Sequence, residues 1–256
     1  MDLGLKGKKA IVTGATRGIG RAIAETLAAE GVDLAICARN KDQVDEAVAA
    51  LKKNGVNVVG GVVDIADGPG LKKWVAEAGG QLGGIDLLVT NASALTIGNT
   101  EEAWKGCFDI DVMGAQRAFD AALPFLEKSA KASSDAAVVF ISSVSAAETT
   151  NGNAYGAMKA AQIHLAKGLA KEHAGKHVRV NVVSPGTVYF KGGVWHMVET
   201  NMAEMFKATM ARNPMGRMAT PQDIANATVF LLSPASSFTT GINMLVDGAI
   251  TGRVNF

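Results

Sequence analysis

The sequence predicts an α/β fold: a doubly wound parallel sheet of about seven strands with helices on both faces. Short apolar runs alternate with amphipathic stretches along the chain, and each apolar run is nearly continuous instead of alternating with polar residues. Such runs are typical of strands covered on both faces, as in a parallel sheet. The 256 residues show neither a linker nor a repeat of fixed period, so residues 1–256 are expected to form a single domain.

The predicted strands are short and mostly rich in valine and isoleucine. In chain order they are Ala10–Thr13 with its lead-in, Val32–Ala38, Val56–Val63, Ile85–Thr90, Ala136–Ile141, Val178–Ser184 and Ile242–Val246. Between them lie segments with helical apolar spacing. These are Ile19–Glu30, Lys41–Asn54, Gly70–Gln81, Glu101–Lys128, Ala154–Ala174 and Pro221–Leu232. The last helix has a strong start signal, because Thr220 can cap it and proline suits its first position. Lys128–Asp135 reads as a solvated loop.

A glycine-rich turn follows the first predicted strand. Gly14, Gly18 and Gly20 have the spacing Gly-x-x-x-Gly-x-Gly, and a helix begins within the turn. Residues without Cβ let the backbone turn tightly and approach a pyrophosphate, while the helix N-terminus offers free N–H groups. In this place the turn predicts a dinucleotide site in a Rossmann-like domain, and Thr16 and Ile19 belong to the same site.

The end of the second strand indicates which dinucleotide is bound. Residues 37–40 read Cys-Ala-Arg-Asn, without the acidic residue that would hold the ribose 2′-OH of NAD. Arg39 stands there instead, and Arg17 lies inside the glycine turn. Two guanidinium groups suit a 2′-phosphate, so NADP(H) is the predicted cofactor. The alternative is that both arginines are ordinary solvated residues.

A pair of residues suited to acid–base chemistry follows the fifth strand. Tyr155 and Lys159 are four residues apart, which places the phenol and the ammonium on one helix face. An adjacent positive charge favours ionisation of a phenol. The preceding strand ends in Ile141-Ser142-Ser143, at the sheet edge where ligands of open α/β sheets bind.

Together these motifs resemble the short-chain dehydrogenase/reductase family, over essentially the whole chain from Thr13 to Gly248. The resemblance implies that Tyr155 exchanges a proton with the substrate oxygen and that Lys159 holds the nicotinamide ribose and assists the tyrosine. Ser143 would hydrogen-bond the substrate carbonyl. The family serine usually lies thirteen residues before the tyrosine and Ser143 lies twelve before it, so Ser142 remains the alternative.

Further family motifs imply the remaining cofactor contacts. Asp64 would bond the adenine amino group, with the Ile65 backbone beside it. The pair Asn91-Ala92 would lie along the cofactor. Pro185-Gly186 and the Val188 backbone would lie at the carboxamide.

The chain also departs from the family pattern. Asp111 stands where the family normally has an asparagine linked to the proton relay behind the lysine. We include it among the catalytic residues, although a charged carboxylate leaves the form of the relay open. Thr90, Ser93, Phe190 and Ala249 also replace the usual residues.

Residues 187–218, between the sixth strand and the last helix, are the expected substrate lid. They hold Tyr189, Phe190, Trp195, Phe206 and the methionines at 197, 202, 205, 210, 215 and 218. Flexible thioethers and aromatic rings suit a bulky or mainly apolar substrate. The alternative is that they pack on the domain or on a neighbouring subunit. The histidines show no ligand spacing with cysteines or acids, so no metal site is expected.

The leading hypothesis is an NADP(H)-dependent oxidoreductase that interconverts a ketone or aldehyde and an alcohol, with the tyrosine as proton donor. One alternative is a 3-oxoacyl thioester reductase. An alternative of another class is a non-catalytic NADP(H)-binding sensor or scaffold, suggested by Asp111.

Composition narrows the partners. The net charge of +1 predicts neither nucleic acid nor an anionic membrane as a partner, and no apolar run approaches the ~20 residues of a membrane span. Two cysteines and a polar N-terminus fit a cytoplasmic protein. The expected partner is a small carbonyl or alcohol substrate, and the family resemblance suggests a homotetramer or homodimer.

Overall fold

Seven parallel strands form one sheet in the order β3-β2-β1-β4-β5-β6-β7, in a computed structural model that describes residues 2–148 and 152–254. The strands are β1 Lys9–Thr13, β2 Asp33–Ala38, β3 Val58–Val62, β4 Leu87–Thr90, β5 Ala136–Ile141, β6 Val178–Pro185 and β7 Asn243–Val246. β1 pairs with both β2 and β4, so the strand order reverses there. Ligands of doubly wound sheets bind outside the carboxyl ends of the strands at this reversal. The predicted fold class is confirmed.

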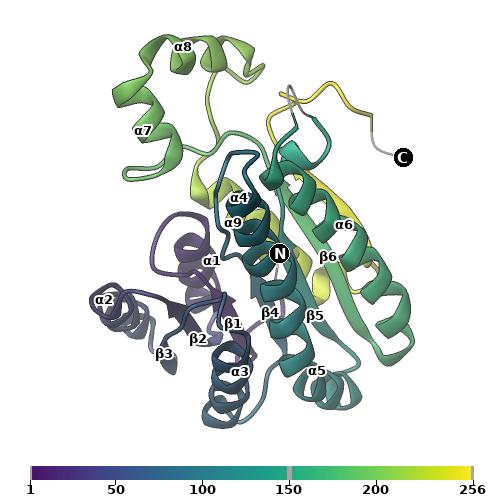
Figure 1. Cartoon of the computed structure of the whole chain (residues 1–256). Helices are drawn as coiled ribbons and strands as arrows, with labels where there is room; N and C mark the ends of the chain where they lie inside the picture. The colour runs from purple at the N-terminus through teal and green to yellow at the C-terminus, as the bar shows by residue number, and fades with distance from the viewer. Residues whose placement is uncertain (1, 149–151, 255–256) are drawn as a thin grey trace.

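Helices cover both faces of the sheet (Figure 1). They are α1 Gly18–Ala29, α2 Lys41–Leu51, α3 Gly68–Leu82, α4 Glu101–Cys107, α5 Gly114–Ser133, α6 Ala154–His173, α7 Val194–Asn201, α8 Ala203–Arg212 and α9 Pro221–Leu232. Short 3-10 turns lie at Lys52–Asn54, Val144–Ala146, Ala174–Lys176 and Pro234–Ser236, and a π-helical turn lies at Phe108–Met113. Among the described residues, no helix is long and apolar enough to cross a membrane.

The two faces of the sheet carry separate hydrophobic cores. One is shared with α1, α2 and α9, and the other with α3, α5 and α6. In β1, Ala10 and Val12 belong to the first core and Ile11 to the second. Successive strand side chains point to opposite faces, and here both faces are buried. This is why the strands read as unbroken apolar runs.

The helix predicted at Glu101–Lys128 differs from the structure. The π turn at Phe108–Met113 separates α4 from α5, and Asp111 lies in this turn. The solvated loop predicted at Lys128–Asp135 is wrong, because α5 continues to Ser133, and only Ser134, with φ 57°, and Asp135 lie between this helix and β5. The polar residues between 128 and 135 obscure the helical spacing of buried residues, which continues to Ala130.

Asp135 is buried by a partner far away in the sequence. Arg179, on β6, donates from Nε to Asp135 Oδ1 at 2.6 Å and from Nη2 to Oδ2 at 3.2 Å. The same guanidinium donates to the carbonyl of Leu231 at 2.7 Å and that of Ser233 at 3.1 Å. One buried cation therefore joins β5, β6 and the end of α9 at the edge of the sheet opposite the glycine turn.

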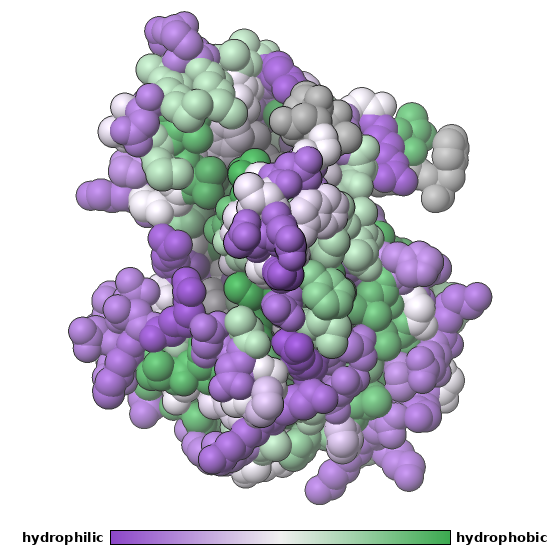
Figure 2. Space-filling model, in the orientation of Figure 1, coloured by the Kyte–Doolittle hydropathy of each residue, from purple (hydrophilic) through white to green (hydrophobic). Residues whose placement is uncertain are grey.

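The expected lid forms two helices, α7 and α8, which project beyond the carboxyl edge of the sheet (Figure 1). The sequence patterns did not assign these helices. Figure 2 shows hydrophobic and hydrophilic residues mixed over the lid and over the face of the molecule below it.

Candidate active site

The glycine turn packs directly against the end of β4. Gly14 and Gly18 have φ values of 65° and 57°, which favour glycine. A Cβ at Gly20 would collide with the Gly14 carbonyl and with the Asn91 amide, so Gly20 serves close packing. Asn91 Nδ2 donates to the carbonyls of Thr13 at 3.0 Å and Gly14 at 2.9 Å. The amide of Asn91 thus locks the turn to β4, and its predicted place along the cofactor stays a prediction.

The start of α1 is suited to an anion. Its N-cap residue, Arg17, has an extended backbone and makes no side-chain cap, and the first turn holds no acidic residue. The first N–H groups of the helix are therefore not used by a capping side chain, and the helix dipole adds a partial positive charge. These features fit the pyrophosphate of a dinucleotide. Thr16 donates to Gln43 Oε1 at 3.4 Å, and Ile19 packs partly on the core under the turn.

The two predicted phosphate ligands differ in their surroundings. Arg17 is exposed, and its Nη1 donates to the carbonyl of Gly192 at the base of the lid at 3.2 Å. Arg39 is exposed just after β2, and within the described part of the chain it makes no hydrogen bond or ion pair. Arg39 is therefore the freer of the two for a 2′-phosphate.

The predicted adenine residues follow β3. Asp64 is exposed and its Oδ1 accepts from the Ala66 N–H at 3.0 Å. Ile65 is buried, and its side chain packs so closely on Gly114 of α5 that a Cβ there would collide with it. Ala92, which is predicted to lie along the cofactor, follows β4 and donates its N–H to Thr13 Oγ1 at 3.2 Å. Asp64, Ile65 and Ala92 thus all lie at the carboxyl edge of the sheet.

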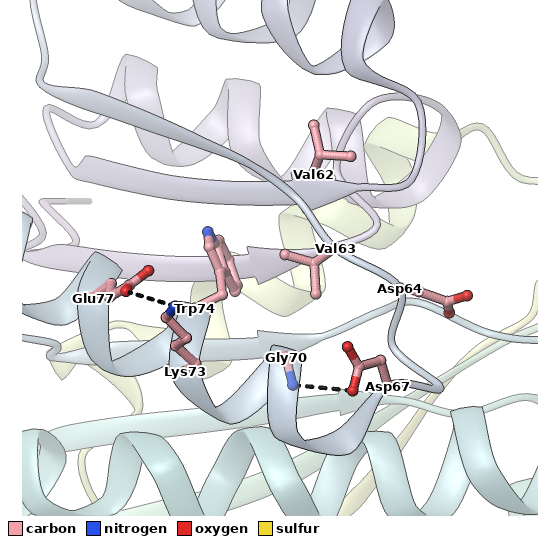
Figure 3. Close-up of a pocket in the computed structure, with 8 residues that line it drawn as sticks. All are labelled: Val62, Val63, Asp64, Asp67, Gly70, Lys73, Trp74 and Glu77. Carbon is pink, nitrogen blue, oxygen red and sulfur yellow. Dashed lines mark hydrogen bonds and ion pairs between the residues drawn. The ribbon is translucent and has the colours of Figure 1, made fainter.

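A hollow of about 260 Å³ lies beside Asp64, between β3 and α3 (Figure 3). Trp74 forms part of its wall, and Figure 3 shows the Asp64 carboxylate at the opposite end. Lys73, the cation of this lining, lies 3.9 Å from Glu77. Because the lining also contains Asp64 and Asp67, the hollow is unfavourable for a phosphate. The arginines at the glycine turn suit that group better.

Two of the predicted catalytic side chains, Tyr155 and Lys159, lie close together on α6, next to the end of β5. Lys159 Nζ donates to the Ile141 carbonyl at 2.9 Å and lies 5.6 Å from the centre of the Tyr155 ring. Ser142 donates its hydroxyl to the Lys159 carbonyl at 2.9 Å. Ser143 Oγ accepts from the Ser145 N–H at 3.1 Å, and its own proton has no acceptor among the described residues. This difference favours Ser143 over Ser142 as the substrate ligand.

Asp111 meets Lys159 directly. Its Oδ1 lies 2.9 Å from Lys159 Nζ, and the side chains are 0% and 2% exposed. Oδ2 accepts from the Ala94 N–H at 3.2 Å. The departure from the family asparagine therefore creates a buried ion pair beside the tyrosine.

The end of β6 faces the glycine turn. A Cβ on Gly186 would lie 2.8 Å from the Asp247 Cα, so the Pro185-Gly186 turn needs glycine for packing. Val188 is buried and bridges to Ala219. The Phe190 ring lies against Gly18, which ties the base of the lid to the turn. The bulk of this ring anchors the base of the lid on the turn.

The lid has a small aromatic centre and an open outer surface. Tyr189 donates its hydroxyl to Glu199, and this bond raises the pKa of the phenol. The Tyr189 ring lies 6.1 Å from that of Phe206. Four lid methionines are exposed and one is buried; the exposed ones are Met197, Met202, Met205 and Met215, and the buried one is Met218. Most lid methionines are thus exposed and available for contact.

Comparison with known proteins decides the family. A family model described as enoyl-(acyl carrier protein) reductase matches residues 14–251. Isoepoxydon dehydrogenase of Penicillium expansum is 37% identical over 255 residues, covering 98% of this chain and 97% of the relative. The chain belongs to the short-chain dehydrogenase/reductase family.

Solved members of the short-chain dehydrogenase/reductase family share the fold closely. L-sorbose reductase from Gluconobacter frateurii, complexed with NADPH and L-sorbose, superposes with a TM-score of 0.89 at 30% identity, covering 99% of this chain and 100% of that one. The Pseudomonas aeruginosa RhlG/NADP complex has a TM-score of 0.88 at 30% identity, with 97% and 98% covered. This short-chain dehydrogenase/reductase is an oxidoreductase that binds NADP(H) and interconverts a carbonyl and an alcohol in a small-molecule substrate.

Two polar residues near the site were not anticipated. Asn153 caps α6 by accepting from the Gly156 N–H at 2.8 Å, just before Tyr155. Gln162 donates to the Asp111 carbonyl at 2.6 Å. The capping position of Asn153 and the i,i+3 spacing of Gln162 from Lys159 are the sequence signals that could have indicated them.

Proposed function

We propose that the chain reduces a ketone or aldehyde to an alcohol, with Tyr155 as the proton donor, Ser143 as the ligand of the carbonyl oxygen and Lys159 as the group that assists the tyrosine. The observation that supports these roles lies where β5 ends and α6 begins: Lys159 Nζ is 5.6 Å from the centre of the Tyr155 ring and donates to the carbonyl of Ile141, two residues before Ser143. Bound NADPH would supply the hydride. The residues 1–256 would act as one catalytic domain.

Each residue has a task that its position suits. The Ser143 hydroxyl, whose proton has no acceptor in the described part of the chain, would donate to the substrate oxygen and orient it. Tyr155 is half-buried at the start of α6 and would donate its proton to the same oxygen as negative charge develops there. The buried Lys159 ammonium would keep the phenol and the nicotinamide ribose in place.

The cofactor would lie along the turn residues, with the pyrophosphate at the start of α1. Arg17 and Arg39 would take the 2′-phosphate and Asp64 and Ile65 the adenine. Asn91 and Ala92 would flank the middle of the cofactor. The carboxamide would meet Pro185, Gly186 and the Val188 backbone.

The serine assignment has a matched control within the chain. Ser143→Ala should lower kcat by about 100-fold, the usual loss for one donor to a developing oxyanion. Ser142→Ala removes a bond to the Lys159 carbonyl, so it should lower thermal stability and spare most of the turnover. A larger kcat loss in Ser142→Ala than in Ser143→Ala would reverse the assignment.

The main test is turnover of NADPH with a panel of carbonyl compounds. Tyr155→Phe should abolish it on every accepted substrate, and full turnover by that variant would refute the proposed acid. The panel should include 3-oxoacyl thioesters, which test the alternative of a thioester reductase; the matched family model is that of an enoyl-(acyl carrier protein) reductase, so an enoyl thioester belongs in the panel as well. Binding of NADPH with no turnover on any compound would favour the non-catalytic alternative.

The lid supports a bulky or mainly apolar substrate. Exposed apolar side chains lie on the lid at Met197 and Met202 and on the segment after β4 at Leu95 and Ile97. The named substrate of L-sorbose reductase is instead a polyhydroxylated ketone. Comparing kcat/KM for apolar and hydroxylated ketones of equal size tests which class the site prefers.

A cytoplasmic homotetramer or homodimer fits the surface. β7 is an edge strand whose residues are all half-buried, and the nearby Phe238 is fully exposed. An uncovered edge strand beside an exposed aromatic ring suits contact with a second copy. Light scattering of the protein should show an oligomer, and Phe238→Asp should weaken it.

A further inference from the structure

Asp111 and Lys159 form a buried ion pair held on several sides. Besides the 2.9 Å contact between them, the ammonium donates to the Ile141 carbonyl at 2.9 Å. The carboxylate accepts from the Ala94 N–H, and the Asp111 carbonyl accepts from Gln162 Nε2 at 2.6 Å. Both partners are therefore fixed, and neither can be screened by water as a surface charge is.

The π turn explains why the carboxylate reaches the lysine. Phe108–Met113 adopt π-helical geometry between α4 and α5, and Asp111 is the buried residue of this turn. π turns of this kind shift a side chain relative to an uninterrupted helix and are frequent at functional sites. Leu95, beside the bonded Ala94, has φ 52°, a strained value for leucine. The carboxylate therefore joins the lysine to the segment after β4.

The charges that face Tyr155 are few. α6 contributes Lys159, the π turn contributes Asp111, and α4 contributes Cys107. Burial raises the pKa of the Cys107 thiol, and the charge of Asp111 raises it further, while Lys159 opposes this. Of the other carboxylates of α4 and the π turn, Glu102 is exposed, and Asp109 is partly exposed and lies 3.9 Å from Arg117. The buried pair therefore brings one acidic and one basic side chain to this site.

We propose that Asp111 is a positioning residue that cancels the charge of Lys159 and so makes Tyr155 keep its proton to higher pH, which suits donation to a carbonyl. The inference rests on the proposed role of Tyr155. The family asparagine would leave the same site with a net charge of +1. A group of side chains with a net positive charge loses a proton more easily than a neutral group does. This holds whichever of the coupled side chains releases the proton. Asp111 thereby favours the reductive direction.

The titration of Tyr155 can be followed without any substrate. The chain has two tyrosines, so Tyr189→Phe leaves Tyr155 as the single source of tyrosinate absorbance. In that background, Asp111→Asn should form tyrosinate at a pH about one unit lower or more, as expected for loss of a buried charge a few ångströms away. Asp109→Asn, which removes a partly exposed carboxylate from the same turn, is the matched control and should titrate like the background. Tyr155→Phe in the same background supplies the blank.

An unchanged or higher midpoint in Asp111→Asn would overturn the proposal. Asparagine is usual in the family at this position, so the variant is compatible with the fold, and Asp111→Ser makes the same prediction with a smaller side chain. The pH profile of kcat/KM for reduction should move in the same direction. If the midpoint falls but Tyr155→Phe still turns over, the electrostatic inference stands and the proposed acid is wrong.

Discussion

The two arginines near the glycine turn should contribute differently to cofactor choice. Arg39 makes no hydrogen bond or ion pair within the described residues, whereas Arg17 donates to the Gly192 carbonyl at 3.2 Å. Arg39→Ala should therefore remove mainly the bond to the 2′-phosphate. A hydrogen bond to a charged group contributes about 1.5–3 kcal/mol, and the exposure of Arg39 favours the lower end. This corresponds to a roughly 10- to 30-fold weaker Kd for NADPH.

The assay is equilibrium binding of NADPH and NADH by fluorescence, with both variants. Arg39→Ala should leave the Kd for NADH nearly unchanged, so the preference for NADPH, measured as the Kd for NADH divided by the Kd for NADPH, should fall. Arg17→Ala should weaken both cofactors by a smaller factor, because it also releases the base of the lid near Phe190. If Arg39→Ala weakens NADPH and NADH equally, Arg39 is not the phosphate ligand. If Arg17→Ala alone abolishes the preference, the division of roles is reversed.

Three further predictions concern stability. Arg179→Leu leaves the carboxylate of Asp135 buried and unpaired, so the free energy of unfolding should fall by about 3–5 kcal/mol in urea titrations, and a loss under 1 kcal/mol would contradict the buried ion pair. Ala249 has φ 63°, so Ala249→Gly should raise the free energy of unfolding by roughly 1 kcal/mol, and a lower melting temperature would refute this. The bond from Arg217 and the capping bonds with Thr220 lower the pKa of Asp223. The stabilisation that the Asp223 carboxylate gives the fold is thus complete above the ordinary carboxyl pKa of about 3.9 and is lost as the pH falls towards the lower native value. Asp223→Asn should therefore make the melting temperature depend less on pH over that range. An unaltered pH dependence would show that these bonds are absent in solution.

Much of the fold and part of the site could be predicted from local patterns. Unbroken apolar runs identify strands covered on two faces, and the glycine spacing identifies the turn before α1. The four-residue spacing of Tyr155 and Lys159 places both side chains on one face of α6. These features depend on backbone geometry within a few residues, so the order of residue types is enough to predict them.

Contacts between segments that lie far apart in the sequence could not be predicted from local patterns. Asp135 was assigned to a solvated loop, yet Arg179 buries it. The pattern singled out Asp111 as unusual, but its contact with Lys159 depends on the π turn and on the packing of α6 against it. The docking of Phe190 on Gly18 joins segments that lie far apart in the sequence. Local order determines helices, strands and turns, whereas which charges and rings meet depends on how the whole chain packs.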